Sequence, residues 1–360
     1  MCKSPPTAST RESAGSQDMR ICRGPSLSAS GLIDPQENPE MVYTRQPQNY
    51  IEHLEHSGFS SLPDNFSSTS IFSMPLERLR GYIGNYVVLS QEPYQSAGLA
   101  RIIDLDIQCA QLVFGRLMQA ELLLRRLTVE SYERLSQTPC DYLNPHYYLE
   151  TSPGSVTRLL EDLDEQYRRT NPHHREAPMP SFEQVVDSFS LGLLSRFITQ
   201  YRPDAQDPIL FWKTIAHELE IPVPAFESNL KSLTVFRNRV AHHDRLWAST
   251  SPEAARKARL FAKRLRSSHP RSLHVAVLNL ALFLGPGERE ECAREFENFI
   301  AQDELYYIGL RFCTQVHTKS ECVFMHPLGG GIKRGSLPSF NSAILFAGWV
   351  NQKLTTEWPY

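Results

Sequence analysis

The chain has 360 residues, of which 41% are hydrophobic and 21% charged, and its formal net charge is −3. These values are typical of a globular protein, and with no apolar run of about 18 residues we expect neither a transmembrane helix nor a membrane partner. Because no apolar leader begins the sequence, we expect a cytoplasmic protein. The seven cysteines are scattered without a CxxC pair, so we predict no disulfide framework, metal or cofactor.

The chain falls into three predicted parts. Residues 1–40 are rich in Ser, Pro, Gly and Arg, and we expect them to be disordered because they offer little apolar surface to bury. Patterned sequence begins at Met41, which leads to the hypothesis that translation naturally starts there. Residues 41–302 form one predicted helical domain, and residues 303–360 form a C-terminal extension of unassigned role. The Gly-rich stretch 326–340 lacks the GK[ST] ending of a phosphate-binding loop.

Within the domain, apolar residues recur at helical spacing, which predicts an all-α, mainly helical fold. The longest such segment, 98–135, is predicted to form a single buried helix. A proline-punctuated loop is expected at 171–181. The other predicted helical segments, in chain order, are 48–59, 74–90 (one or two short helices), 155–169, 182–201, 208–220, 225–243, 251–266, 271–284 and 288–302. For 251–266 the predicted start is Ser251 as N-cap with Pro252 in the first turn.

Basic residues are concentrated in one part of this weakly acidic chain. Between Arg237 and Arg271 there are ten Lys or Arg residues against two acidic ones, Asp244 and Glu253. Such a segment is typical of a localised contact with a polyanion, and equally of a solvated helix face. The sequence leaves both interpretations open.

The stretch VFRNRVAHHDRLW, residues 235–247, has the densest hydrogen-bonding chemistry in the chain. On a continuous helix, Asn238 would share a face with His242, and Arg239 with His243. Arg237 and His242 would be separated by about 140° around the axis, at roughly 100° per residue. They would converge only if the helix bent or unwound, or if a second copy faced it.

These side chains suit cleavage of RNA by its own 2′-hydroxyl. A histidine would transfer the proton, Arg237 would stabilise charge on the phosphate, and Asn238 would position the groups. Two other interpretations remain. In the first, the residues serve only the structure by binding carbonyls and carboxylates. In the second, HHD belongs to an HD-type metal phosphohydrolase. That hydrolase would need further ligands, for which His173, His174, His217 and Asp303 are available.

The segment RNRVAHHDRLW resembles the signature of the Abi-like family of bacterial abortive-infection proteins, of the AbiD/AbiF type, within the HEPN superfamily. Its approximate pattern is Arg-Asn-x-x-Ala-His-His-x-Arg-Leu-Trp, and every fixed position is present. Further resemblance lies in an Asp…Glu-x-x-x-Arg helix with Asp106, Glu121 and Arg125, and in DSFSLGLLSRF. Ala248 and Ser249 depart from the Asn-Arg that usually follows the tryptophan. The resemblance spans roughly residues 41–302.

The resemblance implies a HEPN-like helical bundle with additional helices and an irregular C-terminal tail. It implies phage defence by a metal-independent endoribonuclease that leaves 2′,3′-cyclic phosphate ends, with RNA as partner, a homodimer, and a possible RNA or protein antitoxin. The alternative within the family is a non-catalytic RNA-binding or dimerisation module. The expected catalytic residues are Arg237, Asn238, His242 and His243, with either histidine as proton carrier. The expected RNA contacts are Arg239, Arg245, Arg256, Lys257, Arg259, Lys263, Arg264 and Arg266, and the expected structural supports are Glu121, Arg125 and Trp247.

Overall fold

The computed structural model describes residues 48–59, 69–90, 93–174, 177–204 and 206–311, and two short strands beyond them. These residues are mainly helical, which confirms the predicted all-α class. The predicted disordered segment 1–40 and the Gly-rich stretch 326–340 lie outside the described residues. No helix in the described part of the chain is both long and apolar enough to cross a bilayer.

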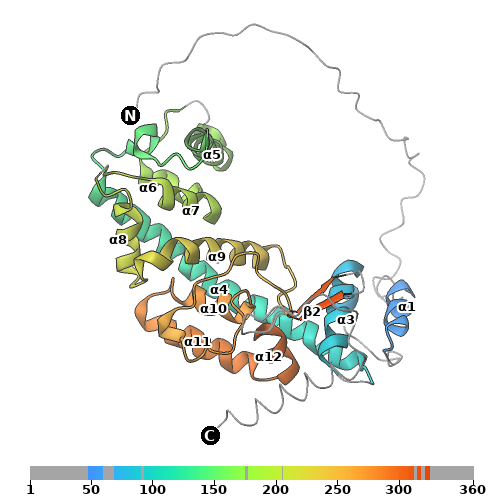
Figure 1. Cartoon of the computed structure of the whole chain (residues 1–360). Helices are drawn as coiled ribbons and strands as arrows, with labels where there is room; N and C mark the ends of the chain where they lie inside the picture. Colours follow the sequence, from blue (N-terminus) through green and yellow to red (C-terminus); the bar gives the residue numbers. More distant parts are fainter. Residues whose placement is uncertain are drawn as a thin grey trace, which may run out of the picture.

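A single helix, α4 (Ser96–Leu135), runs through the protein and organises the rest (Figure 1). It agrees with the predicted 98–135 helix to within two residues at its start. The side of α4 that faces the core carries the buried side chains of Leu99, Ile103, Val113, Leu117 and Leu124. Helices on both sides of the motif pack against α4, and these contacts place residues far apart in sequence next to each other.

The remaining elements follow along α4. Before it come α1 (Gln48–His56), α2 (Thr69–Phe72) and α3 (Leu76–Leu89). After it come α5 (Ser155–Thr170), α6 (Phe182–Val185), α7 (Leu191–Gln200), α8 (Leu210–Glu218), α9 (Val223–Ala241), α10 (Leu273–Ala281), α11 (Pro286–Ile300) and α12 (Glu304–Arg311). Strands β1 (Thr314–His317) and β2 (Glu321–Phe324) pair antiparallel. Part of the expected C-terminal extension, α12, thus packs on α4, α10 and α11.

One predicted helix is broken in a way that matters for the site. The segment 182–201 forms α6, a 3-10 turn and α7, because Ser190 starts a new helix by accepting a hydrogen bond from Leu193 N at 3.2 Å. The break directs the carbonyls of Val186 and Phe189 toward α4, and Val186 O also accepts from Phe189 N at 3.1 Å. Both accept hydrogen bonds from Arg125 of α4.

The prediction of a helix over 251–266 is wrong. The segment is irregular apart from a 3-10 turn at Arg259–Phe261. Its backbone is used in tertiary contacts instead: Ser251 N donates to Arg271 O, and Arg256 N donates to the side chain of buried Asn229 at 2.9 Å. These long-range bonds outweigh the local capping signal at Ser251, whose hydroxyl makes no hydrogen bond to any residue that the structure describes.

Candidate functional site at the end of α9

Helix α9 ends inside the motif, so the placement of the whole motif on one continuous helix is wrong. It ends at Ala241, and His243 adopts a left-handed conformation with φ of +56°. His243 N donates to Val240 O at 3.0 Å and Asp244 N donates to Arg239 O at 2.9 Å. This is the Schellman arrangement, with a histidine at the position that usually holds glycine.

The early end of α9 changes the relation among the motif side chains. The helical pairing of Arg239 with His243 does not form. Asn238, His242 and His243 are instead exposed together where the helix ends. A non-glycine residue with positive φ costs about 1 kcal/mol or more, and such strain is often found at functional sites.

Arg237 is held by an ion-pair relay that starts inside the protein. Glu121 accepts from Arg125 Nη2 through Oε1 at 2.6 Å and from Arg237 Nε through Oε2 at 3.3 Å. The Glu121 side chain is 10% exposed and that of Arg237 is 31% exposed. Arg125 is fixed in turn by the Val186 and Phe189 carbonyls. The structure therefore brings Glu121, Arg125 and Arg237 together, and the Nε edge of the Arg237 guanidinium faces α4.

Two other arginines of the motif bind the chain itself. Arg239 donates to Thr250 O, Arg245 O and Ser249 Oγ, at 3.2, 2.9 and 2.7 Å. Arg245 donates to Gly81 O of α3 at 2.9 Å and lies over the Tyr82 ring, and burial lowers its pKa. These contacts fold the loop after α9, and they do not favour the expected RNA-binding role of Arg239 and Arg245.

The end of the motif is fastened by a buried carboxylate, Asp106 of α4. It accepts from Leu246 N at 2.9 Å, from Trp247 N at 2.8 Å, and from the hydroxyls of Tyr82 and Tyr306. Burial raises the pKa of Asp106, and the four hydrogen bonds oppose that shift. Tyr82 and Tyr306 were not identified from the sequence, because no local pattern shows that two distant tyrosines meet one aspartate.

Trp247 is fully buried, consistent with its expected supporting role. Its indole Nε1 donates to Leu305 O at 3.2 Å, and its ring stacks on Tyr82. A Cβ built on Gly309 of α12 would lie 2.0 Å from Trp247 Nε1, so only glycine fits there. Helix α12 therefore supports the motif from outside the region of resemblance.

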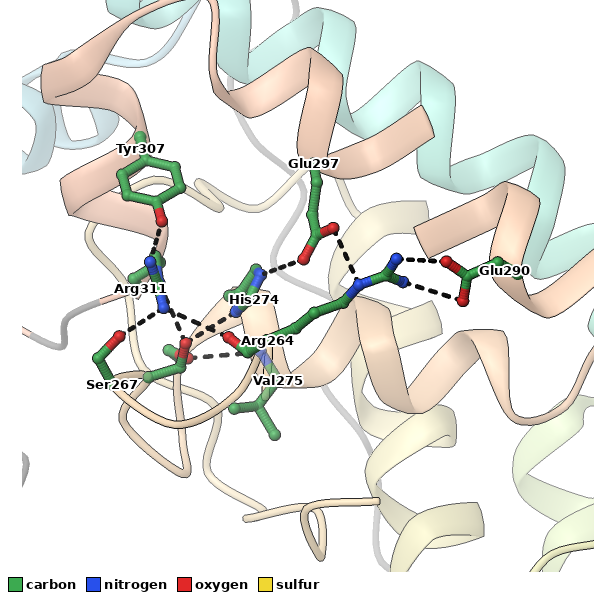
Figure 2. A network of polar contacts seen from close by, with 10 residues as sticks. Arg264, Ser267, His274, Val275, Glu290, Glu297, Tyr307 and Arg311 are labelled. Carbon is green, nitrogen blue, oxygen red and sulfur yellow. Dashed lines mark hydrogen bonds and ion pairs between the residues drawn. The ribbon is translucent and has the colours of Figure 1, made fainter. Parts of the chain in front are cut away.

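The basic residues of 251–266 divide into two groups. Lys257 donates to the carbonyls of Leu265 and Ser268, and Arg264 pairs with Glu290 and Glu297 of α11 (Figure 2). These two hold the segment onto the fold. The other members are exposed: Arg256, Arg259, Lys263 and Arg266.

The same network encloses a buried histidine, His274. Ser268 Oγ lies 2.8 Å from its Nδ1, and Glu297 Oε1 lies 3.7 Å from its Nε2 (Figure 2). Arg311 of α12 donates to Ser268 Oγ at 3.2 Å and to Ser267 Oγ at 2.5 Å. Burial is the main cause of the lowered His274 pKa, and Arg311 and Arg264 add to it. The network therefore joins the basic segment to α10, α11 and α12.

Within the residues that the structure describes, no three His, Cys, Asp or Glu side chains cluster as metal ligands. Asp303, one of the residues considered for a metal phosphohydrolase, pairs with Arg101 at 2.8 Å. It also accepts from Tyr306 N at the start of α12.

Comparison with known proteins identifies the family of the segment that contains α4 and the motif. Residues 70–248 match the family model described as Abi-like protein. The chain is Abi-like. The match supports a role in abortive-infection phage defence in general terms, and it includes α4 and the motif but ends before the basic segment 251–266. Neither the curated proteins nor the solved structures provide a match to this chain.

Proposed function

We propose that this Abi-like protein is a metal-independent endoribonuclease of the AbiD/AbiF type within the HEPN superfamily, acting in abortive infection. Arg237 binds the scissile phosphate and stabilises the charge that develops on it. His242 or His243 transfers the proton of the attacking 2′-hydroxyl, and Asn238 positions the reacting groups. The products carry 2′,3′-cyclic phosphate ends.

The observation that carries this proposal is the anchoring of Arg237. Glu121 contacts only its Nε, and the terminal nitrogens make no hydrogen bond in the described part of the chain. An arginine whose Nε is fixed by a carboxylate, and whose two terminal nitrogens can still donate, is preorganised to bind a phosphate. Its planar guanidinium matches two phosphate oxygens. Arg125 and Arg239 differ from Arg237 because both of their terminal nitrogens donate to groups of the fold, as expected of structural arginines.

The histidines fit a proton-transfer role by position. Both are exposed at the end of α9, next to Asn238, where an RNA strand reaches them without opening the fold. The left-handed backbone of His243 supports a functional reason for histidine at that position, because glycine would relieve the strain. An imidazole titrates close to neutral pH and serves as general base or acid without a metal.

The exposed basic residues supply a place for the RNA backbone. Arg256, Arg259, Lys263 and Arg266 lie on the segment that follows the motif, and Arg264 and Lys257 fix that segment to the fold. Such contacts position RNA without reading its sequence. Each phosphate contact removed should lower the slope of log affinity against log salt by about 0.7 for single-stranded RNA.

The test is cleavage of total RNA and tRNA by the purified chain in EDTA, with Arg237→Ala and His242→Ala/His243→Ala variants beside it. Cleavage by the wild type alone, with cyclic phosphate ends, supports the proposal. Equal RNA binding without cleavage favours a non-catalytic RNA-binding module. Activity that needs a divalent ion favours the HD-type hydrolase. Growth arrest on expression that the variants relieve would point to a toxin controlled by an RNA or protein antitoxin.

A further inference from the structure

An exposed leucine lies in the middle of the basic segment 251–266. Leu260 is 61% exposed, and it is the one large apolar side chain of this segment that faces solvent. A single exposed leucine is ordinary on a protein surface. The surroundings of Leu260 are not ordinary, because the fold fixes its backbone and surrounds it with unpaired positive charge.

The backbone of Leu260 belongs to the 3-10 turn Arg259–Phe261, which the fold anchors on both sides. Ala262 N donates to Arg259 O at 3.1 Å and closes the turn. The next side chain, Phe261, is buried to 1% exposure and holds the turn in the core. Lys257 Nζ ties the two ends of the segment together through Leu265 O at 3.1 Å. Leu260 is therefore presented to solvent by a fixed turn, and little conformational entropy is lost when a ligand covers it.

The positive charge around Leu260 has no counter-charge in the described part of the chain. The sequence holds no acidic residue between Glu253 and Glu288, and Glu253 pairs with Lys231 of α9 at 2.7 Å. The carboxylates of α11 that approach the segment pair with Arg264 (Figure 2). The exposed cations that form no ion pair with a described residue are Arg256, Arg259, Lys263 and Arg266. The surface thus combines one apolar side chain with four free positive charges, which is complementary to a polyanion with apolar groups.

Three contacts place the basic segment alongside α9, which carries the motif. They join Thr250 O to Arg239, Glu253 to Lys231 and Arg256 N to Asn229, at 3.2, 2.7 and 2.9 Å. Residue numbers rise along the segment as they fall along α9, so the two run antiparallel. The level of Asn229 lies about 12 Å along the axis from that of Arg237, at 1.5 Å per residue. A strand whose phosphate binds Arg237 therefore reaches the basic segment within a few nucleotides.

We propose that Leu260 contacts the bases of unpaired nucleotides while the cations around it bind phosphates, so that Leu260 favours single-stranded over duplex RNA. The inference rests on the proposed function in taking RNA as the ligand. In an A-form duplex, stacking covers the base faces and the major groove is too narrow for side chains. A leucine therefore reaches apolar base surface only in a strand whose bases are unstacked. An anionic membrane fits less well, because membrane-binding surfaces carry a broad apolar face and this segment exposes one leucine.

The experiment measures binding of a 2′-O-methyl RNA by fluorescence anisotropy, with the strand either single or annealed to its complement. The methyl groups block the 2′-hydroxyl attack of the proposed cleavage, so the ligand stays intact. Leu260→Ser should weaken single-strand binding roughly five- to thirtyfold, the effect of exposing most of a buried leucine, and should change duplex binding less than about twofold. Leu260→Met should bind like the wild type. The matched control is Leu122→Ser, which changes a 62% exposed leucine of α4 and should leave binding of both ligands unchanged.

A salt series separates Leu260 from its neighbours. Arg259→Ala should lower the slope of log affinity against log salt by about 0.7, whereas Leu260→Ser should leave the slope unchanged because leucine contacts no phosphate. A wild type that binds neither RNA, or a Leu260→Ser protein that loses neither ligand or loses both equally, overturns the proposal. So does binding to anionic vesicles that depends on Leu260 while RNA binding does not.

These readouts do not use cleavage, so they separate the role of Leu260 from the proposed function. Single-strand binding that depends on Leu260, in a chain that leaves ordinary RNA intact, would refute the ribonuclease while the role of Leu260 stands. Cleavage of ordinary RNA by a chain whose RNA binding does not depend on Leu260 would give the reverse result.

Discussion

Replacing Glu121 with glutamine tests the relay that anchors Arg237. The change keeps the shape of the side chain but removes the charge that pairs with both Arg125 and Arg237, whose partner atoms lie at 2.6 and 3.3 Å. Loss of one partner of a fully buried ion pair costs about 3–5 kcal/mol. Because Arg237 is 31% exposed and Arg125 keeps two carbonyl acceptors, we expect about 2–3 kcal/mol of lost unfolding free energy.

The assay is urea unfolding followed by circular dichroism, and the control is Glu130→Gln. Glu130 pairs with Arg126 at the same i,i+4 spacing on the same helix, but the two side chains are 43% and 61% exposed. The control should therefore change stability by no more than about 0.5 kcal/mol. Equal effects of the two substitutions would refute the idea that Glu121 is an anchor. Under the proposed function, Glu121→Gln also lowers RNA cleavage while Glu130→Gln does not.

Three further predictions concern the motif and its supports. His243→Gly should raise the free energy of unfolding by about 1 kcal/mol, because glycine relieves the strain of the positive φ. The same variant shows which histidine transfers the proton. Loss of cleavage indicates His243, and retained cleavage indicates His242. Gly309→Ala should destabilise the fold by about 3 kcal/mol or more because its Cβ meets the Trp247 indole, whereas Gly287→Ala, with nothing within 4 Å, should be nearly neutral in thermal melts. The pKa of His274 is lowered in the folded state, so the unfolded chain takes up the proton first as the pH falls. The contribution of His274 to the free energy of unfolding should therefore be fully present above about pH 6.5. It should be lost as the pH drops through the folded-state pKa. Urea midpoints at pH 7.5 and 5.5 should therefore separate more for wild type than for His274→Gln, and equal separations would contradict this assignment.

The sequence predicted best the elements whose signals are local and long. Apolar side chains recur at helical spacing along the forty residues of α4, and tertiary contacts left the predicted helix almost unchanged. The motif was found because so many hydrogen-bonding side chains occupy consecutive positions. Its helical end was predicted wrongly, since a histidine at a left-handed C-terminal position carries no such signal.

The parts that the sequence did not predict depend on contacts between distant residues. Asp106 meets Tyr82 and Tyr306 only after three helices have packed, and the segment 251–266 loses its predicted helix to bonds with Asn229 and Arg271. The expected RNA contacts Arg239 and Arg245 turned inward for the same reason. Long-range pairing of this kind overrides local propensity and capping, which are weak preferences.

The most direct test of the central claim is RNA cleavage in EDTA by wild type and by Arg237→Lys, at matched stability. Lysine keeps the positive charge but loses the planar fork that Glu121 orients and that grips two phosphate oxygens. We expect wild type to release fragments with 2′,3′-cyclic phosphate ends and Arg237→Lys to cleave at least tenfold more slowly. Absence of cleavage by wild type, or equal rates for both proteins, would contradict the account.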